Sequence, residues 1–241
     1  RVVFDLGGVF FRWEPLVLLE QVFPQEARDA ARAAHLARAI FQNFDHGSDW
    51  ALFDQGHIEP RPLAERIARR TGLREADLLA LMDAIPGHMV VHRGTVDLLL
   101  ALQQRGLPLY FLSNMPGCYA QWLEDSHRFF DVFTDGIFSG RVGQIKPDAA
   151  IFATADQRFN AAGPGTLFID DMARNIVAAE RHGWQGLLFE HPTVADLTAA
   201  LEQTPSEDTV DIPVAVLQPH GSGPGLFLLA GAEMYRRLAQ L

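Results

Sequence analysis

The sequence predicts an α/β protein in which a parallel sheet is covered by helices on both faces. Four short apolar runs support this fold, and they cover residues 2–4, 107–112, 166–169 and 186–189. Each run is uninterrupted, which is typical of strands buried on both faces rather than half exposed. Helical patterns flank the runs, and such alternation of strands and helices favours a parallel sheet.

The first run is followed by a long segment in which no strand is convincing. Helical periodicity is clear in EARDAARAAHLARAIFQNF and PLAERIARRTG, whereas Gly and Pro interrupt FDHGSDWALFDQGHIEP and IPGHM. We therefore predict a helical insertion over residues 15–86 and a helix over 88–105 that returns to the sheet. An insertion at this point in the chain is expected to lie over the edge at which the first strand ends.

The end of the chain has a different composition. QTPSEDTVD is a polar, acidic linker that contains proline. Beyond it, IPVAVLQ, PHGSGPG, LFLLAG and AEMYRRLAQL predict a strand, a turn, a strand and a helix, a small ββα appendage of unknown role. The predicted division is therefore an α/β core over 1–14 and 87–203, a helical insertion over 15–86, and a linker with its appendage over 204–241.

Composition narrows the classes of function. The 241 residues carry a formal net charge of −10 at pH 7 and their basic residues are scattered, so we expect no nucleic-acid partner. No run approaches the roughly 18 apolar residues of a membrane span, so we expect no membrane partner either. The single cysteine, Cys118, excludes an internal disulfide and fits a reducing, cytoplasmic environment.

Polar side chains follow three of the four predicted strands. Asp5 follows the first, Ser113 and Asn114 the second, and Asp170 and Asp171 the third. Because ligands of open α/β sheets bind at the carboxyl ends of the strands, we expect these side chains at one binding edge. Three close carboxylates repel one another unless a cation lies among them, and oxygen ligands without His or Cys suit Mg²⁺. The alternative is that each aspartate caps the turn or helix that follows it.

Two further pairs of residues at this edge have a functional and a structural interpretation. Gly7 and Gly8 let the backbone approach a ligand and turn its N–H groups toward an anion, or else they form a tight turn without a ligand. Ser113 and Asn114 offer a hydroxyl and an amide to phosphate oxygens, or else they cap the helix predicted for GCYAQWLED.

Lys146, in QIKPD, also has two interpretations. In the functional one, it neutralises charge on Asp5 and on a transferring phosphoryl group. In the structural one, it is a surface lysine before a helix that begins at Pro147, because proline is favoured at the first helical position.

Four motifs in this order resemble the haloacid dehalogenase (HAD) superfamily of hydrolases, namely VVFDLGGV, YFLSN, QIKPD and LFIDD. The resemblance covers roughly residues 2–200. GSDWALFDQGHI and FIDDMARNIVAAERHGW also resemble the branch that contains α-D-glucose-1-phosphate phosphatase. The resemblance implies a Rossmann-like core, with the helical insertion as a cap that closes over the site and selects the substrate.

The resemblance implies a phosphomonoester hydrolase that depends on Mg²⁺. Asp5 would be the nucleophile that attacks phosphorus and forms an aspartyl-phosphate, which water then hydrolyses. Mg²⁺ would be held by Asp5, by the main-chain carbonyl of Gly7 and by Asp170, with Asp171 as a further or water-mediated ligand.

The resemblance also assigns the substrate contacts. Ser113 and the backbone of Asn114 would bind the phosphoryl oxygens, the backbone of Gly8 would approach the same group, and Lys146 would balance the charge. Asn175, one helical turn beyond the aspartate pair, would support the metal site. The substrate is expected to be a small phosphorylated metabolite, with a sugar phosphate as one candidate.

The sequence departs from the family at Gly7. HAD phosphatases commonly have an aspartate at this position, which protonates the leaving group and then activates water. Glycine transfers no proton, and positioned acid–base catalysis is worth about 10² to 10⁴ in rate. The explanations left open are another group or a water chain, a leaving group that needs no proton, or a loss of catalysis. The sugar-phosphatase relatives also lack this aspartate.

Two other functions fit this departure. A haloacid dehalogenase releases halide without a proton, but it needs no metal and lacks the paired acids at positions 170 and 171. A non-catalytic HAD fold that serves as a binding or regulatory module is the other alternative, with the C-terminal appendage as its interaction surface. The Asp5→Asn variant discriminates between an enzyme and such a module.

Overall fold

The computed structural model describes residues 1–161 and 165–189. Its centre is a five-stranded parallel sheet in the order β5-β4-β1-β6-β7. The strands are β1 (Val2–Phe4), β4 (Leu109–Ser113), β5 (Asp135–Phe138), β6 (Leu167–Asp170) and β7 (Gln185–Leu188). All residues of β1, β4 and β6 are buried, which confirms the parallel, doubly covered sheet predicted from the uninterrupted apolar runs.

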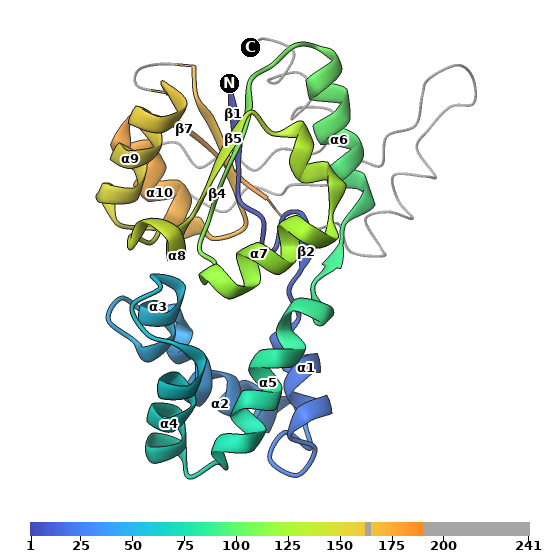
Figure 1. The fold of residues 1–241 in the computed structure, drawn as a ribbon, viewed down its shortest axis with the longest axis vertical. Helices are drawn as coiled ribbons and strands as arrows, with labels where there is room; N and C mark the ends of the chain where they lie inside the picture. Colours follow the sequence, from blue (N-terminus) through green and yellow to red (C-terminus); the bar gives the residue numbers. More distant parts are fainter. Residues whose placement is uncertain (162–164, 190–241) are drawn as a thin grey trace, which may run out of the picture.

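Helices cover both faces of this sheet. The helices that follow the strands are α6 (Arg93–Gln104), α7 (Gly117–Ser126), η2 (Arg128–Val132), α8 (Ser139–Val142), α9 (Ala149–Phe159) and α10 (Ala173–His182). In Figure 1, α9 and α10 lie on one side of the sheet and α6 lies on the other. The chain therefore has the α/β, Rossmann-like architecture that the sequence predicted.

The first five α-helices after β1 form a second body, which we call the helical layer. They are α1 (Pro15–Val22), α2 (Ala30–Phe41), α3 (Asp49–Asp54), α4 (Pro60–Thr71) and α5 (Glu75–His88), with the short η1 (Gln42–Phe44) after α2. N-cap residues mark where two of these helices begin. The side chains of Asp29 and Ser48 accept hydrogen bonds from backbone N–H groups in the first turns of α2 and α3. Figure 1 shows the layer facing one end of the sheet, as expected for an insertion after the first strand. The division of the chain into domains at the predicted residues stays a prediction.

The chain crosses between the two bodies through a small antiparallel ribbon that the sequence did not predict. β2 (Phe11–Arg12) pairs with β3 (Val90–Val91). The predicted helix over 88–105 is therefore wrong in its first turn, because α5 ends at His88 and α6 begins at Arg93. Two-residue strands are too short to produce a periodic pattern, so no sequence signal marked them.

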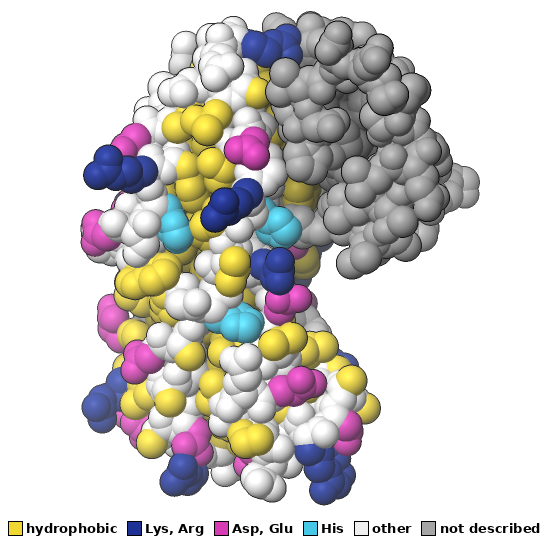
Figure 2. All heavy atoms as spheres, turned by 90° about the vertical axis from the view of Figure 1, so that its right-hand side faces the viewer, with side chains coloured by type: hydrophobic (Ala, Val, Ile, Leu, Met, Phe, Trp, Pro, Cys, Tyr) yellow, Lys and Arg dark blue, Asp and Glu magenta, His cyan; other side chains and the backbone are white. Residues whose placement is uncertain are grey.

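None of the helices in residues 1–161 and 165–189 is long and apolar enough to cross a membrane. On the face shown in Figure 2, basic side chains lie dispersed among acidic ones. The predicted linker and ββα appendage over 204–241 lie outside the described residues.

Candidate active site

Three aspartates meet at the carboxyl edge of the sheet. Asp5 follows β1, Asp170 is the last residue of β6, and Asp171 comes next. The parallel register aligns these positions, because Phe4 pairs with Ile169 and the N–H of Asp5 donates to the carbonyl of Ile169 at 2.8 Å. One carboxylate oxygen from each aspartate lies within 4.8 Å of the others. The sequence prediction that these distant acids converge is therefore confirmed.

Lys146 lies between two of these acids. Its Nζ is 2.9 Å from Oδ1 of Asp5 and 2.6 Å from Oδ2 of Asp170, and its side chain is fully buried. Burial disfavours the ammonium ion, but the two carboxylates outweigh this effect and raise its pKa, so it stays charged. The alternative of a surface lysine before a helix is wrong, because Lys146 is buried and α9 begins only at Ala149 rather than at Pro147.

The side chain of Asn114 positions Lys146. Its amide donates to the carbonyl of Lys146 at 2.9 Å, and its Oδ1 accepts the N–H of Lys146 at 2.8 Å. Asn114 also lines the cavity beside Asp5. Ser113 is the last residue of β4 and is almost completely buried, outside that lining. Neither residue caps α7, whose N-cap is Pro116, and their predicted contacts with phosphate stay predictions.

Asp170 is held by the start of α10. Its Oδ1 accepts the N–H of Met172 at 2.7 Å, and Nδ2 of Asn175 lies 3.0 Å from both of its oxygens. Asn175 therefore supports the acid cluster, as the resemblance implied, through Asp170 rather than through Asp171. The Oδ1 of Asn175 is buried without a hydrogen-bond partner among the described residues.

The charges of the cluster fit a divalent cation. Burial raises the pKa of Asp5 to about 6, although Lys146 counteracts it. Burial and the charges of Asp5 and Asp170 raise the pKa of Asp171 to about 8. Three carboxylates thus share one lysine, and their ionised form needs further positive charge. Oxygen donors this close together, with a spare buried acceptor on Asn175, suit Mg²⁺ and its bound water.

The two glycines after Asp5 have different surroundings. Gly8 has φ +72°, which favours glycine, and a Cβ built there would lie 2.2 Å from Oδ2 of Asp171, so a larger residue would displace that carboxylate. Gly7 lines the cavity, and a Cβ built there would meet no atom within 4 Å. The predicted roles of the Gly7 carbonyl in metal binding and of Gly8 in substrate binding stay predictions.

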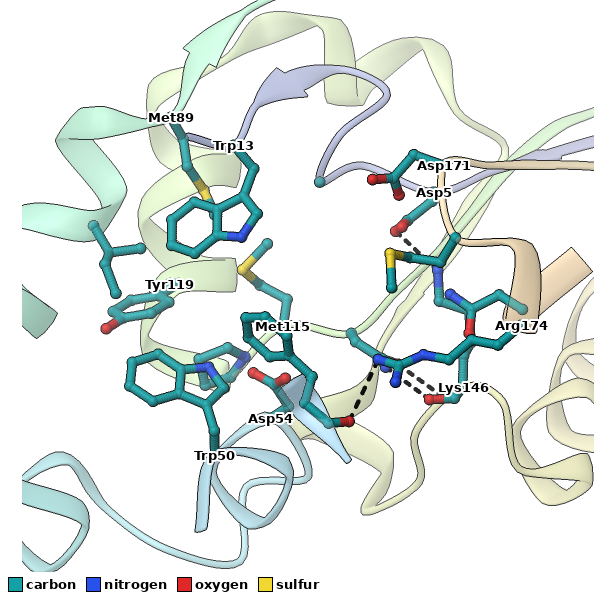
Figure 3. Close-up of a pocket in the computed structure, with 17 residues that line it drawn as sticks. Asp5, Trp13, Trp50, Asp54, Met89, Met115, Tyr119, Lys146, Asp171 and Arg174 are labelled. Carbon is teal, nitrogen blue, oxygen red and sulfur yellow. Dashed lines mark hydrogen bonds and ion pairs between the residues drawn. The ribbon is translucent and has the colours of Figure 1, made fainter. Parts of the chain in front are cut away.

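The cluster opens into a cavity between the sheet edge and the helical layer (Figure 3). One end of the cavity is charged, and the other is mostly apolar but includes Asp54 beside Trp50. The charged end holds Asp5, Lys146, Asp171 and Arg174. The remaining wall is mostly aromatic, aliphatic or methionine side chains, namely Trp13, Phe44, Trp50, Ile85, Met89, Met115, Pro116, Tyr119 and Met172.

Two charged residues of this cavity were not found from the sequence. Arg174 of α10 donates to the carbonyls of Asn43 and Phe44 at 3.3 and 3.4 Å, and so reaches from the sheet body to the helical layer. The sequence indicated Arg174 only by its position in the helical turn that follows the aspartate pair. Asp54 ends α3 and lines the cavity. It lies within GSDWALFDQGHI, but the resemblance of that segment gave Asp54 no role.

The fold agrees with the comparisons to known proteins. A family model for haloacid dehalogenase-like hydrolases matches residues 1–183. The chain therefore belongs to the haloacid dehalogenase-like hydrolase family.

Individual relatives have low sequence identity to this chain. The chain is 26% identical to the sesquiterpene phosphatase astK of Aspergillus oryzae over 186 residues, which is 77% of this chain and 87% of that protein. A HAD family enzyme of Bacteroides thetaiotaomicron, solved with magnesium and inorganic phosphate, matches with a TM-score of 0.60 at 20% identity, covering 83% of this chain and 97% of that one. An L-2-haloacid dehalogenase of Xanthobacter autotrophicus, with chloropropionic acid covalently bound, matches with a TM-score of 0.59 at 16% identity, covering 86% and 84%.

Proposed function

We propose that this hydrolase is an Mg²⁺-dependent phosphomonoesterase that acts through an aspartyl-phosphate on Asp5. One observation carries the proposal: Asp5 lies at the charged end of a cavity, beside a buried lysine and two further carboxylates. Asp5, Asp170, Asp171 and the carbonyl of Gly7 would hold the ion, which when bound supplies positive charge to the phosphoryl oxygens.

The contacts of Asp5 with its neighbours support this proposal. The N–H of Leu6, at 2.7 Å, and Nζ of Lys146, at 2.9 Å, both contact Oδ1. These contacts orient the carboxylate and stabilise its ionised form against burial. In-line attack by Asp5 on phosphorus then forms the aspartyl-phosphate and expels an alcohol. Ser113, the backbone of Asn114 and the backbone of Gly8 are proposed to bind the phosphoryl oxygens, with Lys146 balancing their charge.

The wall of the cavity favours an apolar alcohol as the leaving group. Sugar hydroxyls need several hydrogen-bonding partners, and a wall of indole, thioether and aliphatic groups supplies few. An alkyl or isoprenoid chain would instead be desolvated against Trp13, Met89 and Met115. The relative astK is a sesquiterpene phosphatase, which supports the same class of substrate. A sugar phosphate, suggested by the resemblance in sequence, is the competing substrate in the test.

The test measures inorganic phosphate released from a series of n-alkyl phosphates of increasing length, from farnesyl phosphate and from glucose 1-phosphate. Each added methylene is worth about 0.8 kcal/mol when buried, so kcat/KM should rise roughly fourfold per carbon until the cavity is filled. Activity should require Mg²⁺, and acid-quenched protein should carry covalent phosphate. Asp5→Asn should abolish both signals, whereas the exposed Asp97→Asn should change neither.

Each contrary result points to a different function. A preference for glucose 1-phosphate would overturn the apolar substrate class and leave the phosphatase. Halide release from 2-haloacids without Mg²⁺ would indicate a dehalogenase. Failure of every compound to yield phosphate or halide would favour the non-catalytic binding module.

A further inference from the structure

The site lacks a proton donor where the family places one. Gly7 occupies that position and has no side chain, although the space beside it is open to a Cβ. An alkyl alcohol leaves as a strongly basic oxygen, so a phosphatase for such esters needs an acid elsewhere in the cavity.

We propose that Asp54, contributed by the helical layer, is the acid–base residue of this site. The proposal rests on the proposed phosphatase function. The acid–base residue would then belong to the helical layer, whereas the nucleophile Asp5 belongs to the sheet body.

Asp54 is placed for this role by the cavity. It lines the same cavity as Asp5, it is 7% exposed, and Figure 3 shows its carboxylate among the lining residues. No hydrogen bond or ion pair among the described residues engages that carboxylate, so its oxygens are available to a substrate or a water. Burial, with a contribution from the charge of Asp5, raises the pKa of Asp54 to about 8. Near neutral pH the group therefore holds a proton that it can donate.

The other titratable groups of the cavity are committed elsewhere. Asp5 and Asp171 belong to the acid cluster, and Lys146 is paired with two carboxylates. The hydroxyl of Tyr119 donates to the carbonyl of Met82 at 2.9 Å, and burial raises its pKa. The guanidinium of Arg174 is engaged by the carbonyls of Asn43 and Phe44. Among the acids of residues 1–161 and 165–189 that line the cavity, Asp54 alone lies outside the cluster.

Although Asp54 belongs to the helical layer, its backbone is fixed to the sheet body. The hydroxyl of Ser139, at the start of α8, donates to the carbonyl of Asp54 at 2.5 Å and accepts the N–H of Met115 at 2.8 Å. Two residues after Asp54, the backbone of Gly56 is so close to Gly140 that an added Cβ would lie 2.5 Å from its carbonyl oxygen. This contact holds Asp54 at a defined place relative to the body that carries Asp5.

The proposed reaction has two steps, transfer of the phosphoryl group to Asp5 and hydrolysis of the aspartyl-phosphate. In the first, the carboxylate of Asp5 attacks phosphorus, the bond from phosphorus to the alcohol oxygen breaks, and the carboxylic acid of Asp54 gives its proton to that oxygen. In the second, the carboxylate of Asp54 takes a proton from water as the water oxygen attacks phosphorus, and the bond from phosphorus to Asp5 breaks. Alcohol and phosphate are released, and Asp54 is protonated again.

The decisive test compares two leaving groups in Asp54→Asn. p-Nitrophenolate needs no proton to leave, so the first turnover of p-nitrophenyl phosphate should change less than about tenfold. Hydrolysis of the aspartyl-phosphate then lacks its base, so the variant should release one equivalent of p-nitrophenol in a burst and accumulate phosphorylated protein. Turnover of an n-alkyl phosphate should fall by about 10² to 10⁴. The Asp97→Asn control should behave as the wild type does for both esters.

A second variant tests the same idea by restoring the acid. Gly7→Asp in the Asp54→Asn background places a carboxylate in the open space beside Asp5 and should recover at least tenfold in alkyl phosphate turnover. Equal losses for both esters in Asp54→Asn, or a change in KM alone, would overturn the role of Asp54 while leaving the phosphatase intact. Wild-type protein that hydrolyses neither ester would overturn the proposed function, and the proposal with it.

Discussion

At the scale of single residues, the carboxylate of Asp54 is held in a site that opposes its ionisation. An aspartate titrates near pH 3.9 in an unfolded chain, whereas burial raises the pKa of Asp54 to about 8 in the folded protein. Between these two values the folded state binds a proton that the unfolded state does not. The free energy of unfolding contributed by this group must therefore fall as pH rises through that window.

We expect Asp54→Asn to be more stable than the wild type in alkaline buffer. Asparagine carries no proton to lose, so the advantage of the variant should be smallest near pH 4, grow with pH, and level off above pH 8. The ceiling is several kcal/mol, because each unit of pKa shift corresponds to about 1.4 kcal/mol. Urea unfolding of metal-free protein from pH 4 to 9 measures this difference. A difference that is constant across pH would contradict the raised pKa.

The sequence predicted the residues whose position is set by the sheet. Asp5, Asp170 and Asp171 could be placed together because parallel strands end at a common edge, whatever their distance in the chain. Asp54 could not be placed. Its position depends on how the helical layer packs on the sheet, and no local pattern encodes that packing.

At the scale of elements, one hydroxyl joins the two bodies beside the site. Ser139 donates to Asp54 and accepts from Met115, so it links α3 of the helical layer to the loop after β4. Both backbone groups would lose a partner in Ser139→Ala. An unsatisfied buried polar group costs about 1 to 3 kcal/mol.

We expect Ser139→Ala to lower the free energy of unfolding by about 1 to 3 kcal/mol. Because Asp54 loses its anchor, turnover of n-alkyl phosphates should fall further than the first turnover of p-nitrophenyl phosphate. The matched control is Ser126→Ala, at the exposed end of α7, which should affect neither measurement. A loss of stability that leaves the ratio of the two esters unchanged would show that the link does not position the acid.

The elements themselves were predictable in proportion to their burial and length. The fully buried strands β1, β4 and β6 appeared as apolar runs close to their observed bounds. The edge strand β5 was missed, since DGIF contains an aspartate and a glycine and buries only its last two residues. A short edge strand that is only partly buried contains no uninterrupted apolar run, so the sequence pattern does not indicate it.

At the scale of the whole molecule, the cavity combines groups from both bodies around an excess of negative charge. Lys146 neutralises one of the three clustered carboxylates, and the other two repel each other unless they are protonated or bind a cation. The acid cluster is therefore expected to destabilise the metal-free fold and to stabilise the fold that holds an ion.

Mg²⁺ should accordingly raise the Tm of the wild type. A ligand at one hundred times its Kd stabilises the folded state by about 2.7 kcal/mol, which corresponds to roughly 5 to 10 °C for a protein of this size. Asp171→Asn removes one repelling carboxylate and one ligand together. It should therefore melt above the wild type without metal but gain much less from Mg²⁺, while Asp97→Asn should follow the wild type in both conditions. Differential scanning calorimetry of the three proteins in EDTA and in Mg²⁺ measures the six Tm values. If Asp171→Asn kept the full response to Mg²⁺, the ion would have to be held without Asp171.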